Sequence, residues 1–213
     1  LVALAQTGTG KTAAFGFPML QKIDVNSRTT QGLILSPTRE LCLQITNEMK
    51  HYGKYYNGLN VTAIYGGASI TDQAKQVKRG AQIIVATPGR MKDMISRRLV
   101  DISKIEYAVL DEADQMLDMG FIHDIKKLIA KLPAQRQSLF FSATMPQSIV
   151  QLSGQILGNP QRITIKPEQA TAEKITQGVY FVDKENKIKL LASLVEQSEA
   201  PAVLVFSRTK HGA

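Results

Sequence analysis

The sequence predicts an α/β domain built on a parallel β-sheet that helices cover on both faces. Two observations support this: short runs that are apolar throughout, and helix-length amphipathic segments between those runs. Strands that are apolar on both sides are typical of parallel sheets buried between two helical layers. With 213 residues, the chain is long enough for one such domain and part of another.

Seven short apolar runs are predicted to be strands. They are Leu1–Ala5, Leu33–Ser36, Val61–Tyr65, Ile83–Ala86, Tyr107–Leu110, Leu139–Phe141 and Ile163–Ile165. The predicted helices between them include Glu40–Lys50, Thr71–Lys78, Met91–Arg97, Ile122–Leu132 and Gln147–Leu157. In open parallel sheets, ligands bind beyond the carboxyl ends of the strands. The polar motifs described below all follow such ends.

A polar segment that contains a proline is predicted to link two domains. The first domain is expected at residues 1–166, the linker at 167–173, and the beginning of a second domain at 174–213. The elements expected after the linker are a strand at Gly178–Val182, a helix at Lys184–Glu196 and a strand at Ala202–Phe206. Three elements cannot complete an α/β domain, so only the start of one is expected.

Composition and charge narrow the classes of function. Hydrophobic residues make up 44% of the chain and charged residues 21%, which is typical of a globular protein and excludes a fibrous or disordered one. The net charge of +8 favours a polyanionic partner such as nucleic acid, although it also suits a merely soluble protein. Cys42 is the only cysteine, so a reducing compartment is expected. No apolar run approaches the ~20 residues of a membrane span.

The stretch AQTGTGKT has the pattern of a phosphate-binding loop between a strand and a helix. Its last residues match the second half of G-x-x-x-x-G-K-[ST], although Ala5 stands where that pattern begins with glycine. Loop amides and the helix N-terminus would surround phosphate, Lys11 would bridge the β- and γ-phosphates, and Thr12 would ligate Mg²⁺. A glycine-rich turn is the structural alternative. The nucleotide-binding candidates are Ala5, Gln6, Thr7, Gly8, Thr9, Gly10, Lys11 and Thr12.

The tetrapeptide DEAD directly follows the apolar run EYAVL. Adjacent carboxylates at the end of a buried strand are costly without partners, and Mg²⁺ bound to a nucleotide would be such a partner. Asp111 is expected to hold the metal through water, and Glu112 to act as general base on the attacking water. An acidic turn that caps the next helix explains the motif equally well when it is taken alone. The phosphate loop, with Lys11 as a second catalytic candidate, favours the catalytic interpretation.

Weaker motifs follow the other strand ends. Ser142-Ala143-Thr144 comes after the run LFF, and taken in isolation it is better explained as part of a helix cap. Three loops offer amides, hydroxyls or an arginine that could hold a nucleic-acid backbone. They contain Pro37, Thr38 and Arg39, then Gly66 and Gly67, then Thr87, Gly89 and Arg90. Taken singly, each loop is better explained as an ordinary turn or cap.

Taken together and in order, the motifs closely resemble those of the DEAD-box family of ATP-dependent RNA helicases, within superfamily 2. The motifs are AQTGTGKT, PTREL, GG, TPGR, DEAD, SAT and VFSRT. The stretches DEADQMLDMGF and VFSRTKHGA are most similar to the bacterial RhlE-like subgroup. The resemblance runs from residue 5 to about residue 210. It implies two RecA-like domains and an ATPase that uses ATP and Mg²⁺ and is stimulated by RNA. It also implies local RNA duplex unwinding or RNP remodelling.

The resemblance also implies residue roles. Coupling between the state of the bound ATP and the action on RNA would involve Asp114, Ser142, Ala143 and Thr144. Asp114 would also take part in contacts between the two domains. The RNA backbone path would contain Pro37, Thr38, Arg39, Gly66, Gly67, Thr87, Gly89, Arg90 and Thr209, with low sequence selectivity. The family's adenine-reading element and arginine finger have no counterpart in this sequence. Because an arginine finger contributes roughly 10³–10⁵ in rate, we expect little activity from this stretch alone.

Two other classes of function stay open: a nucleotide-binding switch that unwinds nothing, and a translocase that acts on DNA. The motifs PTREL, GG and TPGR favour a helicase over a switch, which would not need them. DEAD together with SAT favours RNA over DNA, by analogy with the family. The expected partner is therefore RNA, with no membrane association and a cytoplasmic location.

Overall fold

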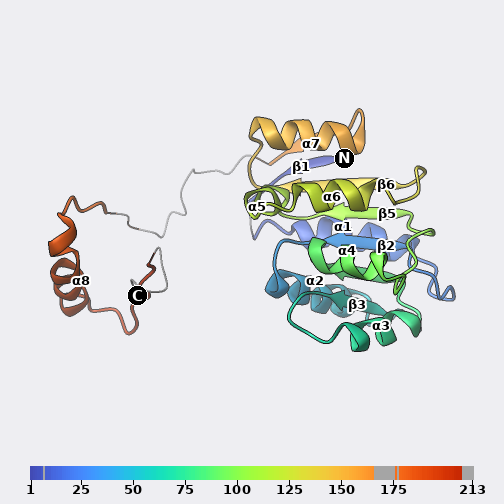
Figure 1. Cartoon of the computed structure of the whole chain (residues 1–213), viewed down its shortest axis with the longest axis horizontal. Helices are drawn as coiled ribbons and strands as arrows, with labels where there is room; N and C mark the ends of the chain where they lie inside the picture. The colour runs from blue at the N-terminus through green and yellow to red at the C-terminus, as the bar shows by residue number, and fades with distance from the viewer. Residues whose placement is uncertain (7, 166–175, 177, 208–213) are drawn as a thin grey trace. The chain divides into compact units, whose positions relative to one another are not determined.

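The structure is a computed structural model that describes residues 1–6, 8–165, 176 and 178–207 (Figure 1). The chain divides into two compact units, Leu1–Glu168 and Gln169–Ala213. The linker predicted at 167–173 lies outside the described residues, as do Thr7 and Thr209. The predicted domain bounds therefore stay a prediction. No helix in the described part of the chain is long and apolar enough to cross a bilayer.

The first unit is built on one seven-stranded sheet with the strand order β3-β4-β2-β5-β6-β1-β7. The strands are β1 (Val2–Leu4), β2 (Gly32–Leu35), β3 (Val61–Ile64), β4 (Ile83–Ala86), β5 (Tyr107–Leu110), β6 (Gln137–Ser142) and β7 (Arg162–Thr164). All neighbouring strands are parallel, and in the centre of the sheet Leu33 aligns with Ile84 on one side and Ala108 on the other. The predicted parallel α/β sheet is confirmed, with strand bounds shifted by at most two residues.

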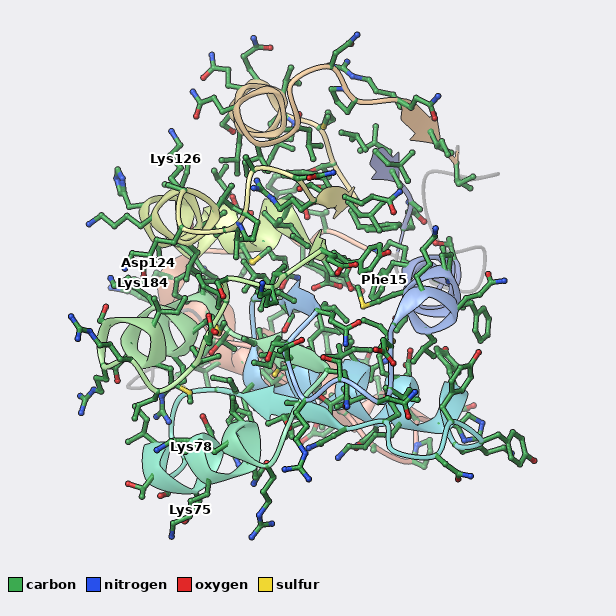
Figure 2. All side chains as sticks on the ribbon, turned by 90° about the vertical axis from the view of Figure 1, so that its right-hand side faces the viewer. Phe15, Lys75, Lys78, Asp124, Lys126 and Lys184 are labelled. Carbon is green, nitrogen blue, oxygen red and sulfur yellow. The ribbon has the colours of Figure 1, made fainter. Side chains whose placement is uncertain are left out.

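Helices cover both faces of this sheet (Figure 1). They are α1 (Lys11–Lys22), α2 (Arg39–Tyr52), α3 (Ile70–Lys78), α4 (Pro88–Ser96), α5 (Ala113–Asp118), α6 (Ile122–Ile129) and α7 (Gln147–Leu157). Helices α1 and α2 pack on one face, and α3 to α7 supply the core on the other. In Figure 2, Phe15 of α1 accordingly lies on the opposite side of the sheet from Lys78 of α3 and Lys126 of α6.

Successive side chains of each strand point to opposite faces of the sheet, which explains how one sheet supports two hydrophobic cores. In β2, Ile34 faces the α1–α2 layer, whereas Leu33 and Leu35 face the other layer. All three are buried, so β2 is apolar throughout, as strands covered on both faces must be. Each such side chain contributes about 1.5–3 kcal/mol through burial. The sheet is therefore a rigid platform for the loops at its ends.

The second unit contains a short 3₁₀ turn, η1 (Lys184–Asn186), and the helix α8 (Lys187–Glu196). These elements match the predicted helix at Lys184–Glu196. The strands predicted at Gly178–Val182 and Ala202–Phe206 are wrong, because neither described segment is a strand. A strand is stable only where its amides pair with a neighbour and one face is buried. Here Phe181 is 98% exposed and Phe206 is 87% exposed.

Candidate active site

The motifs of the first unit gather at one edge of the sheet, because all seven strands are parallel and each of these motifs follows a strand end. Backbone hydrogen bonds continue past the strands and fix where the loops leave. The bonds join Ser36 N to Ala86 O (3.0 Å), Thr87 N to Ile64 O (2.9 Å), Asp111 N to Leu35 O (2.9 Å) and Ala5 N to Ser142 O (3.1 Å). The fold therefore holds the starting points of these loops in a fixed order.

The phosphate loop needs glycine at two positions for its backbone conformation. Gly8 has a φ of +84° and Gly10 a φ of +82°, and a Cβ added at either would meet nothing within 4 Å. Glycine is therefore required by the left-handed backbone and not by crowding. The hydroxyl of Thr9 donates to the carbonyl of Gln6 (2.7 Å) and closes the loop. The helix α1 begins at Lys11 with no acidic residue in its first turn, so its N-terminus favours an anion.

Lys11 is buried inside this loop, with only 8% of the residue exposed. Its ammonium donates to the carbonyl of Ala5 at 3.0 Å, which holds the charge over the loop. A buried ammonium is costly unless an anion lies near, and the carboxylate of Asp111 interacts favourably with it. Thr12 follows in the first turn of α1 and is half-buried.

Asp111 directly follows β5 and is 3% exposed. Burial raises the pKa of its carboxyl from 3.8 to about 6; the attraction of Lys11 opposes this shift, and repulsion by Glu112 adds to it. One carboxylate oxygen, Oδ1, accepts a hydrogen bond from the Glu112 amide at 3.0 Å. The described residues contain no group of three or more side chains able to hold a metal. A lone carboxylate near a phosphate loop fits Mg²⁺, which keeps several waters and takes phosphate oxygens as ligands.

Glu112 turns the chain sharply between β5 and α5. Its φ and ψ of 51° and 52° are left-handed, a conformation that costs a side-chain-bearing residue of order 1–3 kcal/mol. The turn leaves Asp111 buried at the strand end and Glu112 only half-buried. The two carboxylates therefore occupy different environments, as separate metal-binding and base roles would require.

Asp114 connects the DEAD segment to the segment after β6. Its Oδ2 accepts hydrogen bonds from the Thr144 amide (2.9 Å) and the Thr144 hydroxyl (2.8 Å). Burial alone would raise the pKa of Asp114, but hydrogen bonds from Thr144 and the Gln115 amide, together with the nearby Ser142 hydroxyl, outweigh it, and the pKa lies below its ordinary value. Ser142 lies close enough to contribute to this shift, although its buried hydroxyl makes no hydrogen bond of good geometry among the described residues.

The interpretation of Ser142-Ala143-Thr144 as part of a helix cap is wrong. The helix α7 begins at Gln147, its N-cap residue is Pro146, and no side chain caps it. The SAT segment instead joins two motifs, because the carbonyl of Ser142 accepts from Ala5 of the phosphate loop while Thr144 binds Asp114. It is therefore placed to connect the phosphate loop with DEAD.

The first two candidate RNA loops follow β2 and β3, which lie on either side of β4, and a contact between Arg39 and Tyr65 joins them. The hydroxyl of Thr38 accepts from the Leu41 amide (3.2 Å) and caps α2. The guanidinium of Arg39 lies 5.0 Å from the centre of the Tyr65 ring, within the range of a cation–π contact. Gly66 and Gly67 follow Tyr65 and are exposed. Pro37 is buried, so its position in the loop is structural.

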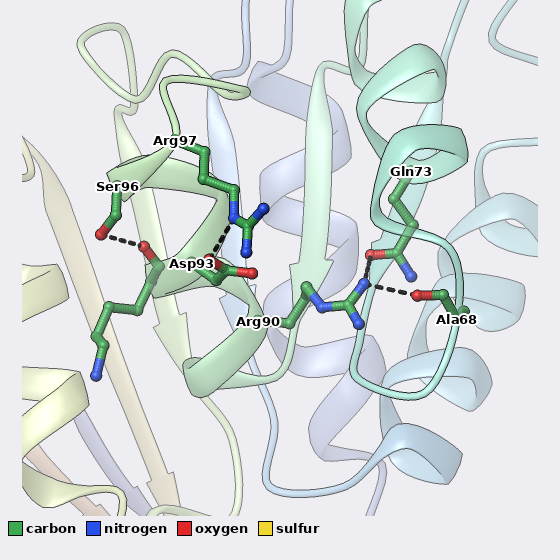
Figure 3. Close-up of polar contacts among 7 residues, drawn as sticks. Ala68, Gln73, Arg90, Asp93, Ser96 and Arg97 are labelled. Carbon is green, nitrogen blue, oxygen red and sulfur yellow. Dashed lines mark hydrogen bonds and ion pairs between the residues drawn. The ribbon is translucent and has the colours of Figure 1, made fainter.

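The third loop is tied to the second by Arg90 (Figure 3). Its Nη1 donates to the carbonyl of Ala68 (2.9 Å) and to the side-chain oxygen of Gln73 (3.3 Å). Gln73 in turn donates to the carbonyl of Tyr65 (3.0 Å). Thr87 and Gly89 stand half-buried beside Arg90 at the start of α4.

Sequence reasoning missed Tyr65 and Gln73. Gln73 is only 5% exposed on an otherwise amphipathic helix, and both of its amide atoms have hydrogen-bond partners. A buried glutamine carries no local sequence signal, because glutamine is mostly found on exposed helix faces. The contact of Tyr65 with Arg39 joins residues that are distant in the chain and was likewise invisible.

A model of the DEAD/DEAH box helicase family matches residues 1–152. The chain belongs to the DEAD/DEAH box helicase family. It is 46% identical over 210 residues to the ATP-dependent RNA helicase DeaD of Mycobacterium tuberculosis, a match that covers 99% of this chain and 37% of that protein. The chain thus spans well under half of this helicase relative.

Solved structures of DEAD-box proteins share its fold. A DEAD box protein from the hyperthermophile Methanococcus jannaschii is 37% identical with a TM-score of 0.75, over 93% of this chain and 53% of that one. The Saccharomyces cerevisiae protein Dbp5, solved with ligands that include ADP, is 33% identical with a TM-score of 0.69, over 77% and 43%. The resemblance to DEAD-box helicases and the predicted RecA-like fold are confirmed.

Proposed function

We propose that this chain is the part of an ATP-dependent RNA helicase that binds ATP, takes part in its hydrolysis, and grips RNA during local duplex unwinding or RNP remodelling. One observation carries the proposal: buried Lys11 and Asp111 lie at the same sheet edge as three loops with phosphate-binding groups. A plain nucleotide switch would need only the first of these two features. The names of the helicase relatives support the same conclusion.

Residues Ala5 to Thr12 would hold the nucleotide. Amides of the loop and of the first turn of α1 donate to the phosphates, and Gly8 and Gly10 let the backbone approach closely. Lys11 would turn from the carbonyl of Ala5 toward the β- and γ-phosphates, where its charge stabilises the transition state. Thr7 is proposed for the same loop from its sequence position alone.

Asp111 and Thr12 are the residues that would hold Mg²⁺, Asp111 partly through water. When bound, the ion would neutralise charge that develops on the phosphate oxygens. Asp111 is buried and cannot reorient freely, so it would fix the position of its ligand. Glu112, half-buried on the strained turn, would accept a proton from the attacking water.

The hydrogen bonds of Asp114 with Thr144 and of Ala5 with Ser142 would carry the state of the nucleotide to the RNA-binding loops. Ala143 lies between these two attachments and would move with them. The sugar and phosphate groups of RNA would be bound by Thr38, Arg39, Gly66, Gly67, Thr87, Gly89 and Arg90. Pro37 would shape its loop, and Thr209 is proposed from its sequence position in the second unit. Contacts of this kind do not distinguish bases. We propose a cytoplasmic location, supported by the single, buried Cys42.

Lys11→Ala tests the nucleotide site. We expect the variant to keep the fold and lose binding of a fluorescent ATP analogue, because no other described lysine is buried in that loop. In the full-length protein, RNA should increase the rate of ATP hydrolysis, and the variant should lose this activity. Lys22→Ala, at the exposed other end of α1, is the matched control. Unchanged ATP turnover in Lys11→Ala would remove Lys11 from the site, and a full-length protein indifferent to RNA would refute the helicase function.

A further inference from the structure

The edge of the sheet opposite the candidate active site has a basic pocket of its own. A cavity of about 500 Å³ lies there between the loop before β2, the last residues of α3, and the end of α4 with the residues that follow it. Its lining includes four cationic side chains, Arg28, Lys78, Arg98 and Lys104, and one acidic residue, Asp101. We call it the amino-edge pocket.

The cations of the amino-edge pocket are available to a ligand. All four are exposed, and none of them takes part in an ion pair between described residues, whereas Lys75, Lys92 and Arg97 nearby are each paired with an aspartate. The single acid of the pocket, Asp101, accepts a hydrogen bond from the Ser103 amide at 2.9 Å and also attracts Lys104, so it offsets part of the charge of that one cation.

The loop that carries Arg28 is fixed by packing. A Cβ on Gly80 would lie 3.2 Å from the Cβ of Arg28, so the arginine stem rests directly on the glycine. Beside it, the buried Thr30 hydroxyl donates to the carbonyl of Ala81 at 2.9 Å. The charge of Arg28 is therefore presented from an ordered loop.

A second pocket of about 390 Å³ adjoins the first, since Ile95 of α4 lines both. It lies between α4 and α6 and adds the exposed cations Lys127 and Lys131, while Lys92 on its rim is held by Asp124 at 2.6 Å. Together the two pockets form an elongated basic surface. Lys78 of α3 and the residues of α6 lie on the same side of the sheet (Figure 2).

Helix ends account for only part of this charge. Lys78 and Arg98 stand at the C-termini of α3 and α4, where cations offset the helix dipole. Lys127 and Lys131 stand likewise in and just after the last turn of α6. Arg28 and Lys104 stand in loops, so their charge has no such explanation. Two adjoining pockets also exceed what one phosphate would fill. The surface is suited to an extended polyanion.

We propose that the amino-edge pocket and its neighbour bind the phosphodiester backbone of RNA that flanks the strand held at the carboxyl edge. The inference rests on the proposed function, which brings RNA to Thr87–Arg90 at the start of α4. That helix has nine residues and spans about 14 Å at 1.5 Å per residue, so it leads from the carboxyl-edge loops to Arg98 over a few nucleotides. Such a contact holds a long RNA on the protein independently of the strand being remodelled.

Two triple variants of this chain with equal charge change test the inference. The pocket variant is Lys78→Gln/Lys104→Gln/Lys127→Gln, and the control is Lys22→Gln/Lys50→Gln/Lys126→Gln, at exposed positions that line neither pocket. Binding of hexauridylate and of an oligouridylate about four times as long is measured by fluorescence anisotropy across a salt series. For the pocket variant we expect about tenfold weaker binding of the long RNA and a salt slope reduced by about 2.

Hexauridylate should bind the wild type and both variants alike, and the control should keep wild-type binding of the long RNA. Equal loss in the two variants would overturn the inference, because the cations would then act only through net charge. So would a wild type that binds the long RNA no better than hexauridylate, or polyglutamate that competes as well as RNA of equal charge. A wild type that binds neither RNA refutes the proposed function itself, which separates that failure from the others.

Discussion

Asp111 and Asp114 belong to one tetrapeptide, yet the fold shifts their pKa values in opposite directions. Asp111 is 3% exposed at the end of a central strand, and burial raises its pKa to about 6. Asp114 lies three residues further on, where hydrogen bonds, led by the two from Thr144, together outweigh burial and lower its pKa. The difference indicates two kinds of carboxylate. One is held at a cost in stability, and the other contributes to stability.

The largest expected effect is that of Asp111→Asn. An acid whose pKa is raised by folding favours its protonated form, so folding stability falls as pH rises from about 4 to 6 and stays low above. At 1.36 kcal/mol per pKa unit, ionised Asp111 costs the fold up to about 3 kcal/mol at pH 7. In metal-free urea titrations, Asp111→Asn should therefore be more stable than wild type at pH 7 and equal to it at pH 4.

The same substitution should reduce ATP hydrolysis by the full-length protein at least about 100-fold, because a neutral amide cannot stabilise the metal as a carboxylate does. Stabilisation together with loss of activity is the expected pair of results. A less stable Asp111→Asn at pH 7 would show that the attraction between Asp111 and Lys11 outweighs burial, and would contradict the comparison.

The second effect concerns Asp114 and Thr144. A double-mutant cycle with Asp114→Ala and Thr144→Val should give a coupling energy of about 1 kcal/mol at pH 7, because Asp114 is partly exposed. A carboxyl group whose pKa is lowered by folding stabilises the fold at any pH above its ordinary pKa. The coupling energy should therefore vanish as the pH falls through the lowered pKa of Asp114. Asp118→Ala, at the exposed end of α5, is the control and should show no coupling with Thr144→Val.

The smallest effect on stability is expected at Glu112, between the two aspartates. Glycine adopts left-handed backbone without penalty, so Glu112→Gly should stabilise the fold by up to about 1 kcal/mol and abolish ATP hydrolysis. Arg98→Gly is a matched control for the backbone effect, because Arg98 has a similar φ of 56° far from DEAD, and this variant should be stabilised by a similar amount. Destabilisation of both variants in thermal melts would mean that neither backbone is strained.

The sheet could be predicted from the sequence because its strands carry their own signal. Runs such as Ile83–Ala86 are apolar on both sides and are buried on both sides in the structure. The same signal failed at Gly178–Val182 and Ala202–Phe206, which have strand-like composition but pair with no strand among the described residues. Composition predicts the ability to form a strand, and pairing decides whether one forms.

The candidate site could be predicted as a set of positions but not as a geometry. Parallel strands bring Lys11 and Asp111 to one edge, so their proximity followed from the fold class alone. The bond from Thr144 to Asp114 spans 30 residues, and the strained turn at Glu112 depends on how β5 meets α5. Neither has a local pattern, so SAT taken in isolation favours a helix cap, and only the family resemblance predicts its connection to DEAD.

The ties between Arg90, Gln73, Tyr65 and Arg39 have a consequence for the speed of binding. These side chains hold two loops and a helix together through contacts within the protein. An RNA strand that binds to groups already in place loses only its own conformational entropy. Because the protein then needs no rearrangement, the association rate is set by how often the two molecules collide in the right orientation. Under the proposed function, cutting these ties with Gln73→Ala would therefore slow the association of RNA more than it would speed its dissociation.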